Sequence, residues 1–264
     1  MNYGILVDTT KCTACESCVY ACAQQHDISL QQIIKEKAIN RDELSAYRLS
    51  TIIKINSDNF ARKSCMHCLE PSCVSACLVG GLTKSPQGPV VYDPDKCIGC
   101  RYCMIACPFH IPRYEWDKVS PLMVKCDMCV DRIDRGEKPA CVEACPNGAI
   151  IFGERDKLLK EAHDRIKNNP AAYLDHIWGE KEFGGTSVIY ISQVELDKLG
   201  WPKTIAKSIP SLTEPLVHST PFIGLSVAVG LISVNWMVKR RMKLSDKVSG
   251  DEHKTEKKEQ DLSE

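Results

Sequence analysis

The chain has 264 residues, a length that suggests one or two folded domains, and 44% of its residues are hydrophobic. Its 34 basic and 34 acidic side chains give zero net charge, which argues against a general nucleic-acid binder, because such proteins usually carry a basic surplus. The unusual feature is the presence of 16 cysteines, and their meaning depends on spacing.

The cysteines fall into four groups of four, with none left over. The first and third groups share the spacing C-x2-C-x2-C-x3-C, and Pro108 follows the third. This spacing is typical of bacterial [4Fe–4S] ferredoxins, in which the fourth Cys ligates a different cluster from the first three. At four thiolates per cluster, the chain is predicted to bind four [4Fe–4S] clusters. The groups are Cys12, Cys15, Cys18 and Cys22; Cys65, Cys68, Cys73 and Cys77; Cys97, Cys100, Cys103 and Cys107; and Cys126, Cys129, Cys141 and Cys145.

Other uses of cysteine explain the pattern less well. Structural zinc also uses paired C-x2-C motifs, but it does not explain a third Cys at the same spacing, twice. A disulfide scaffold is expected in small secreted domains. Covalent haem needs C-x-x-C-H, and no C-x-x-C of this chain is followed by His. His67 lies inside a cysteine loop and could replace a ligand, but the full set of cysteines favours a place beside the ligands or at the surface.

The cysteine region is internally duplicated. Residues 8–12 align with residues 93–97, and each segment follows a β-branched run that predicts a strand. Residues 73–77 align with residues 141–145. Each half therefore predicts a strand, a ligand loop, a short helix, a second ligand loop, a short helix and a strand, with helices near 18–25 and 103–107. In such an α+β unit the clusters replace much of the hydrophobic core, so the apo chain should be poorly ordered.

Duplication alone leaves the pairing of the groups open. Groups one and two could share clusters, and likewise groups three and four. Alternatively, groups two and three pair, and group four pairs with group one. Only 19 residues separate groups two and three, whereas 42 separate groups one and two, so spacing favours the second, nested arrangement.

The chain resembles the four-cluster iron–sulfur (β) subunits of membrane-bound respiratory oxidoreductases, such as formate dehydrogenase, membrane hydrogenases and dimethyl sulfoxide reductase. The matching segments are 65–73, 97–113, 125–132, 139–142 and 184–191, within a similarity that covers roughly residues 4–238. One departure is Leu78, where such proteins commonly have Pro; it removes no ligand. The resemblance implies the nested pairing, with clusters on Cys12, Cys15, Cys18 and Cys145; on Cys22, Cys126, Cys129 and Cys141; on Cys65, Cys68, Cys73 and Cys107; and on Cys77, Cys97, Cys100 and Cys103.

Basic residues adjoin the ligand loops. Sixteen thiolates and four oxidised cores of charge +2 would add about −8 to the neutral apo chain, because bound ions must be counted in the local charge. Basic side chains beside the loops are candidates for offsetting this charge and tuning the cluster potentials. They are Lys11, Lys96, Arg101, Lys125 and Arg132.

The chain changes character after the cysteine region. Leu158, Leu159, Ala162 and Ile166 predict an amphipathic helix within 154–169. By resemblance, residues 171–210 form an arm against a catalytic partner. Residues 222–238 are an uncharged run of 17 residues, which residues 216–221 extend, and a membrane-spanning helix needs about 20. A single membrane span is therefore predicted.

Charge indicates the orientation of this span. Five basic residues follow it within 239–247 and two precede it closely, which favours a cytoplasmic C-terminus and a periplasmic cluster domain. Residues 1–10 contain no basic residue and no apolar signal region, so export together with a partner is expected. A cluster domain that faces the cytoplasm is the alternative. Residues 245–264 carry mixed charges without aromatics, which predicts disorder.

The sequence thus predicts a duplicated bacterial-ferredoxin-like α+β domain, a C-terminal arm and one transmembrane helix. The expected divisions are 1–153, with an insertion at about 26–62, then 154–215, 216–240 and a tail at 241–264. We expect a non-catalytic electron-transfer subunit between a catalytic subunit (hydrogenase or molybdopterin enzyme) and a quinone-reactive membrane subunit. A free-standing soluble ferredoxin is the alternative. G-x-x-x-x-G-K-[ST], G-x-G-x-x-G and H-E-x-x-H motifs are absent.

Overall fold

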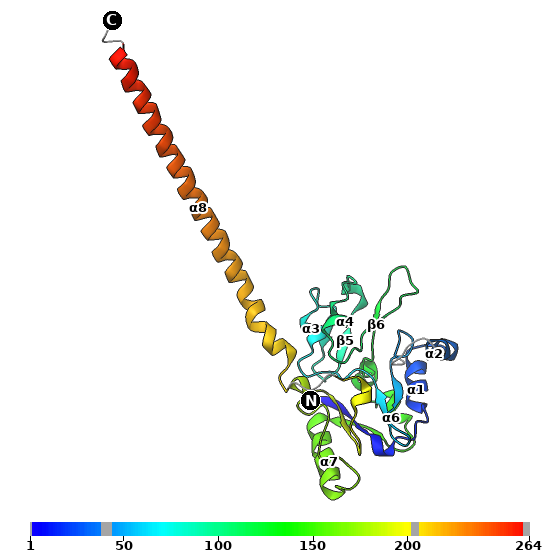
Figure 1. Ribbon diagram of the computed structural model, residues 1–264. Coiled ribbons are helices and arrows are strands. Elements are labelled where there is room, and N and C mark those ends of the chain that lie inside the picture. The colour runs from blue at the N-terminus through cyan, green and yellow to red at the C-terminus, as the bar shows by residue number, and fades with distance from the viewer. Residues whose placement is uncertain (1, 38–43, 202–205, 261–264) are drawn as a thin grey trace. The chain divides into compact units, whose positions relative to one another are not determined.

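The computed structural model describes residues 2–37, 44–201 and 206–260 (Figure 1). The chain divides into two compact units, Met1–Leu212 and Thr213–Glu264. The first unit mixes short helices with four small sheets. The second unit consists, within its described residues, of the long helix α8, which begins at Ile209 and ends at Gln260.

A three-stranded sheet organises the first unit, in the order β8-β1-β9. The strand β1 (Tyr3–Asp8) pairs antiparallel with β8 (Ile150–Glu154) and parallel with β9 (Val188–Ile191). Its side chains alternate between two cores. Leu6 faces the helix α7 (Arg155–Asn168), whereas Ile5 and Val7 face the core that contains cysteines. The predicted helix within 154–169 is confirmed by α7.

Helix α7 covers one face of this sheet with an apolar stripe. Its buried residues Leu158, Ala162 and Ile166 are spaced four apart, so they lie on one side of the helix. They pack with Leu6, Ile189 and others in a cluster that contains no cysteine. This layer is therefore held by ordinary hydrophobic packing.

Two local arrangements repeat the same order of elements. In one, β1 leads through the 3-10 turn η1 (Thr9–Lys11) to α1 (Ser17–Gln25), which packs against α6 (Ala140–Glu143). In the other, β5 (Val90–Tyr92) leads through η2 (Pro94–Lys96) to α4 (Tyr102–Ala106), which packs against α3 (Ser72–Ser75). The helices expected near 18–25 and 103–107 are confirmed by α1 and α4.

The strands pair across the two aligned halves of the sequence. β1 of the first half pairs with β8 of the second half. In the same way β4 (Leu82–Lys84), the last strand of the first half, pairs with β5 of the second half. Figure 1 shows the two groups apart within the first unit, with α3, β5 and α4 at one end and α1 and α6 at another. The chain thus crosses between the groups twice.

The remaining elements surround these groups. The segment expected as an insertion contains α2 (Leu30–Lys37), β2 (Thr51–Lys54) and most of β3 (Phe60–Lys63), while residues 38–43 lie outside the described chain. The hairpin of β6 (Arg113–Tyr114) and β7 (Met123–Val124), helix α5 (Val130–Asp134), η3 (Glu182–Gly184) and η4 (Asp197–Leu199) complete the unit. Residues expected as an arm supply β9, whose four residues are all buried.

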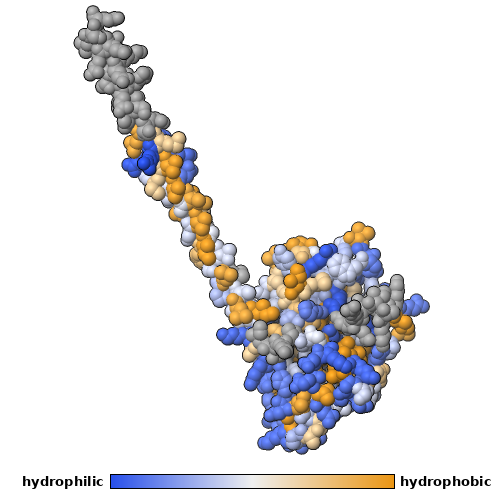
Figure 2. All heavy atoms as spheres, viewed as in Figure 1, coloured by the Kyte–Doolittle hydropathy of each residue, from blue (hydrophilic) through white to orange (hydrophobic). Residues whose placement is uncertain are grey.

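Helix α8 carries an apolar stretch. Its segment Ile209–Leu244 is long and apolar enough to cross a membrane, by length and composition. Side chains of residues 220–244 are exposed, and Figure 2 shows orange, hydrophobic atoms along this part of the helix. The helix continues to Gln260 through residues that we expected to lack regular structure.

Candidate metal centres

Unusual backbone conformations shape the cysteine loops. Between Cys12 and Cys18, Ala14 and Glu16 both adopt a left-handed conformation (φ 56°), and the aligned residues Gly99 and Arg101 do the same (φ 69° and 66°). Non-glycine residues adopt this region at a cost of order 1–3 kcal/mol, and they persist only where the surroundings impose it. Two loops at aligned positions thus share one constrained shape, which turns successive thiols toward a common centre.

Short helices then separate the last cysteine of each loop from the others. Cys18 and Cys22 lie one turn apart on α1, and Cys103 lies on α4 with Cys107 at its end. Backbone amides also approach sulfur, since Gly99 N–H donates to Cys97 Sγ and Met128 N–H to Cys126 Sγ, each at 3.4 Å. All sixteen cysteines are free thiols in the structure.

The first neighbourhood of thiols, site A, surrounds a small cavity. Its sulfur residues come from both ends of the cysteine region, and Val7, Ile52 and Ile150 close it with apolar side chains. Burial raises the pKa of the Cys12 thiol, and the neighbouring thiolates of Cys145 and Cys15 raise it further. Site A comprises Cys12, Cys15, Cys18 and Cys145.

The second neighbourhood, site B, is fully enclosed. Burial raises the pKa of Cys141 to about 11; Arg62 lowers it, whereas the thiolates of Cys22 and Cys129 raise it. The pKa of Cys126 is also raised, first by burial, and Cys22 is again a close charged neighbour. Site B comprises Cys22, Cys126, Cys129 and Cys141.

Two further neighbourhoods lie beyond site B. Burial raises the pKa of Cys68 well above its usual range, and the thiolates of Cys65, Cys107 and Cys73 add to the rise. Burial likewise raises the pKa of Cys103, with Cys100 and Cys97 beside it, and Cys77 packs in the same apolar cluster. Site C comprises Cys65, Cys68, Cys73 and Cys107, and site D comprises Cys77, Cys97, Cys100 and Cys103.

The four sites follow one another in a row. Sites A and B meet where Cys18 and Cys141 are electrostatic neighbours, and B and C where Cys126 and Cys65 are. Cys73 of site C and Cys103 of site D are neighbours in the same way. Of the sixteen cysteines, only Cys15 and Cys100 are exposed, and they lie in sites A and D. The row thus reaches the surface at its two ends.

Of the five basic residues that the sequence favoured, one is buried beside the sites. It is Lys125, whose Nζ donates to the carbonyl oxygens of Val90 and Cys126. Lys11 and Lys96 are exposed; Lys11 pairs with the buried Asp8, and Lys96 pairs with the partly exposed Asp93. Arg101 lies over the Trp116 ring, 4.5 Å from its centroid, and Arg132 pairs with Glu143 and Glu137.

Sequence reasoning missed two cations near the ligand loops, the half-buried Lys84 and the buried Arg62. Lys84 Nζ donates to the carbonyl oxygens of Cys68 (2.8 Å) and His67 (3.1 Å), and Arg62 is 1% exposed. Arg62 lies three residues before Cys65, at the end of a strand, and this proximity was the available signal. A charged residue in a strand that leads into a ligand loop is therefore a candidate for contact with a cluster, as is one within the loop.

His67 is buried beside the ligands and is not at the surface. Its Nδ1 accepts a hydrogen bond from Val90 N–H at 2.9 Å, which leaves the ring proton on Nε2. Burial holds the pKa of His67 well below its usual range, and the charges of Lys125, Lys84 and Arg62 lower it further. The ring is therefore neutral, and its Nδ1 lone pair is engaged by the backbone.

A second histidine adjoins site B. Ligand atoms of His26, Asp127 and Cys129 lie within 4.8 Å of one another. The Asp127 carboxylate, whose Oδ1 lies 3.4 Å from His26 Nε2, is the main influence that raises the pKa of His26, to about 12, and Cys129 and Cys22 act in the same direction. Because two of these neighbours are cysteines of site B, the pair of His26 and Asp127 is part of the surroundings of that site.

The donor set fits iron–sulfur clusters. Each site offers four thiols, and soft thiolate ligands suit [4Fe–4S] clusters. Desolvation raises the pKa values of eight of the sixteen thiols, because burial disfavours the thiolate form unless positive charge lies close to it. Bound iron would supply such charge at every site, and Arg62, Lys84 and Lys125 add fixed charge from the protein.

Comparisons with known proteins identify the fold family. Residues 57–155 match the model of the 4Fe-4S dicluster domain. Hydrogenase-2 operon protein HybA of Escherichia coli O157:H7 is 33% identical over 96% of this chain and 89% of its own. The chain belongs to the iron–sulfur subunit family of respiratory oxidoreductases. Two further members, both from Escherichia coli K12, are the B subunit of anaerobic dimethyl sulfoxide reductase (37% identical; 62% of this chain, 78% of its own) and the iron–sulfur subunit of nitrate-inducible formate dehydrogenase (33%; 70% and 66%).

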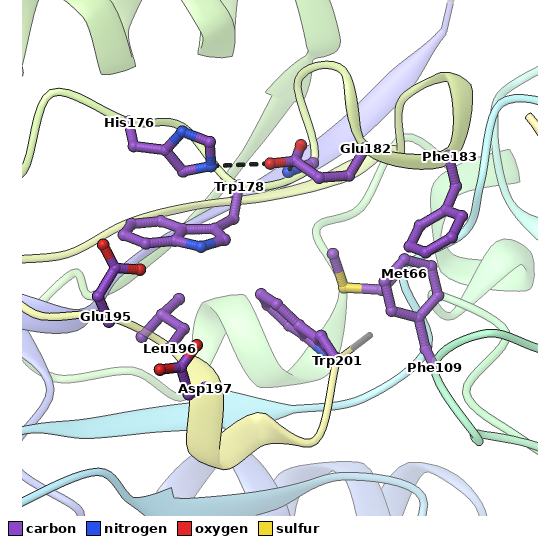
Figure 3. A pocket seen from close by; sticks show the side chains of 11 residues that line it. Met66, Phe109, His176, Trp178, Glu182, Phe183, Glu195, Leu196, Asp197 and Trp201 are labelled. Carbon is purple, nitrogen blue, oxygen red and sulfur yellow. Dashed lines mark hydrogen bonds and ion pairs between the residues drawn. The ribbon is translucent and has the colours of Figure 1, made fainter. Parts of the chain in front are cut away.

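This member of the iron–sulfur subunit family also has an aromatic pocket beside site C (Figure 3). The pocket has a volume of about 510 Å³, and the aromatic rings of Trp178, Trp201, Phe109 and Phe183 line it. Met66 directly follows Cys65, and Phe109 comes two residues after Cys107, so the wall of the pocket continues into the ligand loops. His176 Nε2 lies 2.8 Å from Glu182 Oε1, and no cysteine lines the pocket. His176 and Glu182 thus pair with each other and not with the thiols.

Proposed function

We propose that the protein relays single electrons through four [4Fe–4S] clusters between a catalytic oxidoreductase subunit and a quinone-reactive membrane subunit. The grouping of sixteen thiols into sites A to D, in a row with exposed thiols only at its ends, carries this proposal. Electron tunnelling falls steeply with distance, so adjacent sites suit a relay. Exposed ends suit entry and exit of electrons.

In this proposal each site holds one cluster, and the pairing is nested. Support comes from the cavity of site A, which Cys145 lines together with Cys12, Cys15 and Cys18, whereas Cys141 does not line it. The repeated order of strand, 3-10 turn, ligand loop and helix supports a duplicated ferredoxin-like origin, with A and B in one copy and C and D in the other.

A bound [4Fe–4S] cluster supplies reversible one-electron chemistry. The chain's own residues hold the thiols, exclude water and supply charge. Site B is buried completely, and Lys84 and Lys125 bring ammonium groups to the backbone of ligands Cys68 and Cys126. Burial and fixed charge are two of the influences that set cluster potentials. The side chains found here thus suit a carrier of electrons.

The exposed end of site D supports a partner contact. Ile98, Tyr102 and Ile105 lie close to Cys100 in sequence and are exposed, and Trp116 and Val119, further along the chain, are exposed as well. Figure 2 shows hydrophobic atoms gathered at the top of the first unit, where Figure 1 places α3 and α4. Contiguous exposed apolar surface on a soluble domain marks an interaction site. One partner subunit is therefore expected to cover site D.

Helix α8 supports anchoring in a membrane. Four basic residues, Lys239, Arg240, Arg241 and Lys243, follow the apolar run, and the positive-inside rule then favours a cytoplasmic C-terminus. In this orientation the cluster unit is periplasmic and is exported with a partner. The proposed divisions remain the cluster domain at 1–153, the partner-contacting segment at 154–215, the span at 216–240 and the tail at 241–264.

Metal analysis and cysteine substitution test the proposal together. Anaerobic protein should hold about sixteen iron and sixteen sulfide, four per cubane. Cys145→Ser and Cys12→Ser should remove the same EPR signal, whereas Cys141→Ser should remove the signal lost in Cys126→Ser. The pairing of Cys12 with Cys145 is the sharpest comparison, because only the nested arrangement puts these two residues on one cluster. Loss of different signals in Cys12→Ser and Cys145→Ser would refute nested pairing, and stoichiometric zinc would refute the clusters themselves.

A further inference from the structure

Arg62 is a buried cation whose position in the fold is fixed. It lies on β3 opposite Ile52 of β2, and its carbonyl oxygen accepts a hydrogen bond from Tyr190 O–H at 2.8 Å. Tyr190 belongs to β9 and is itself completely buried. The backbone is thus held from two sides, and the side chain is 1% exposed. The guanidinium is therefore shielded from solvent.

The hydrogen-bonding capacity of this guanidinium is largely unused. Nη1 donates to Ser64 Oγ at 2.6 Å, but Nε and Nη2 are buried without a partner among the described residues. A buried guanidinium without an anionic partner is strongly unfavourable, because the desolvation of its charge is not compensated. Among the described residues no carboxylate forms a hydrogen bond or ion pair with Arg62, so its charge requires another negative group.

The groups that surround Arg62 are thiols of two sites. Arg62 lines the cavity of site A together with Cys12, Cys15, Cys18 and Cys145. Of the thiols that lie close enough to act electrostatically on the guanidinium, Cys141, Cys126 and Cys22 belong to site B and Cys18 belongs to site A. Arg62 thus lies between the two sites.

We propose that Arg62 is a positioning and tuning residue that donates N–H groups to the clusters of sites A and B and raises both reduction potentials. The proposal rests on the proposed function, since it requires clusters at both sites. Nε and Nη2 are two separate donors, so one guanidinium can face two anionic groups. Arginine suits this place better than lysine because its planar group is weakly hydrated and offers five donors in a fixed geometry.

The direction of the effect follows from charge. Reduction adds one negative charge to a cluster, and a fixed positive charge nearby stabilises the reduced form more than the oxidised form. Hydrogen bonds to cluster sulfur act in the same sense. Because Arg62 adjoins both sites, one residue raises the two potentials together and favours the passage of an electron between them.

Redox titration of Arg62→Gln tests this role. The substitution keeps a polar side chain but removes the charge, and it should lower the reduction equilibrium constants of the A and B clusters at least tenfold, about 59 mV for a one-electron couple. Signals would be assigned with Cys12→Ser and Cys126→Ser. Arg62→Lys keeps the charge and should give a smaller shift. Lys84→Gln is the matched control, because its ammonium group contacts Cys68 of site C and it should leave A and B unchanged.

The outcomes separate this inference from the proposed function. Wild-type protein without four clusters refutes both. Four clusters with unchanged A and B potentials in Arg62→Gln, or a shift at one site alone, refute the role of Arg62 and leave the relay intact. If Arg62→Gln fails to assemble these clusters, pulsed EPR of the wild type labelled with 15N-arginine decides. We expect nitrogen coupling to both reduced clusters, and its absence at either refutes the proposal.

Discussion

Asp8 and Arg165, which are 157 residues apart, form an ion pair of 2.9 Å between the end of β1 and helix α7. Asp8 is 1% exposed, and its Oδ2 also accepts a hydrogen bond from Tyr173 O–H at 2.9 Å. Its other oxygen accepts from Thr10 N–H and Thr10 O–H, at 3.2 and 2.6 Å, and so begins the 3-10 turn that leads to Cys12. The cysteine-free layer of the fold thereby fixes the entry to site A.

The aligned residue Asp93 offers a matched comparison. It begins the equivalent turn before Cys97 by accepting from Asp95 N–H at 3.0 Å, but its ion pair with Lys96 is exposed. Asp8→Asn should lower the free energy of unfolding by about 1–3 kcal/mol, because it leaves a partly buried guanidinium with a weaker partner. Asp93→Asn should leave stability unchanged, since exposed ion pairs contribute little. The measurement is thermal loss of the visible cluster absorbance, and equal losses in the two variants would contradict the role of Asp8.

A tyrosine at site D predicts a local change in potential. Tyr114 is 3% exposed, and its hydroxyl oxygen lies 3.5 Å from Cys103 Sγ. Hydrogen bonds to ligand sulfur raise cluster potentials, so Tyr114→Phe should lower the potential of the D cluster and leave the others in place. Tyr102→Phe is the control, because Tyr102 is exposed on the same helix α4. Redox titration followed by EPR measures both; an equal effect of the two substitutions would exclude the Tyr114 hydroxyl as the cause.

Local features of this fold could be predicted from sequence, whereas its long-range contacts could not. Cysteine spacing and apolar periodicity are local, which is why α1, α4 and α7 were expected at nearly their observed bounds. The pairing of β1 with β8 and β9 joins segments far apart in the chain, and no local signal specifies such a register.

The candidate site shows the same difference between local features, which the sequence predicts, and long-range contacts, which it does not. All sixteen cysteines were identified as candidate ligands, and their assignment to individual clusters stays a prediction. Arg62 was missed because its burial has meaning only beside Cys18 and Cys141, which are distant in sequence. Lys11 and Lys96 were favoured by their position in the loops, yet both are exposed and pair with aspartates. Proximity in sequence to a ligand is thus a weak guide to which charges reach a cluster.

Removal of the clusters should unfold the first unit unevenly. Two of its three apolar clusters contain cysteines, whereas the one that joins α7 to β9 contains none. We therefore expect an iron chelator, applied under reducing conditions, to abolish hydrogen-exchange protection first in the ligand loops and in α1 and α4. Hydrogen-exchange protection in α7 and β9 should persist longer than protection in the ligand loops. Uniform loss of protection would indicate that the cysteine-free layer depends on the clusters as strongly as the loops do.

Charge placed in the middle of the apolar run of α8 tests membrane anchoring. Leu231 lies near the centre of residues 222–238, and Arg at the centre of a membrane-spanning helix costs about 2.5–3.5 kcal/mol. Leu231→Arg should therefore shift the protein from the carbonate-resistant membrane pellet toward the soluble fraction. Val238→Arg is the matched control, because Val238 adjoins Lys239 at the end of the run, where an arginine can reach the interface. A peripheral protein held only by its partners would be released by carbonate in wild type and in both variants, and that result would remove the anchor from the proposal while leaving the electron relay untouched.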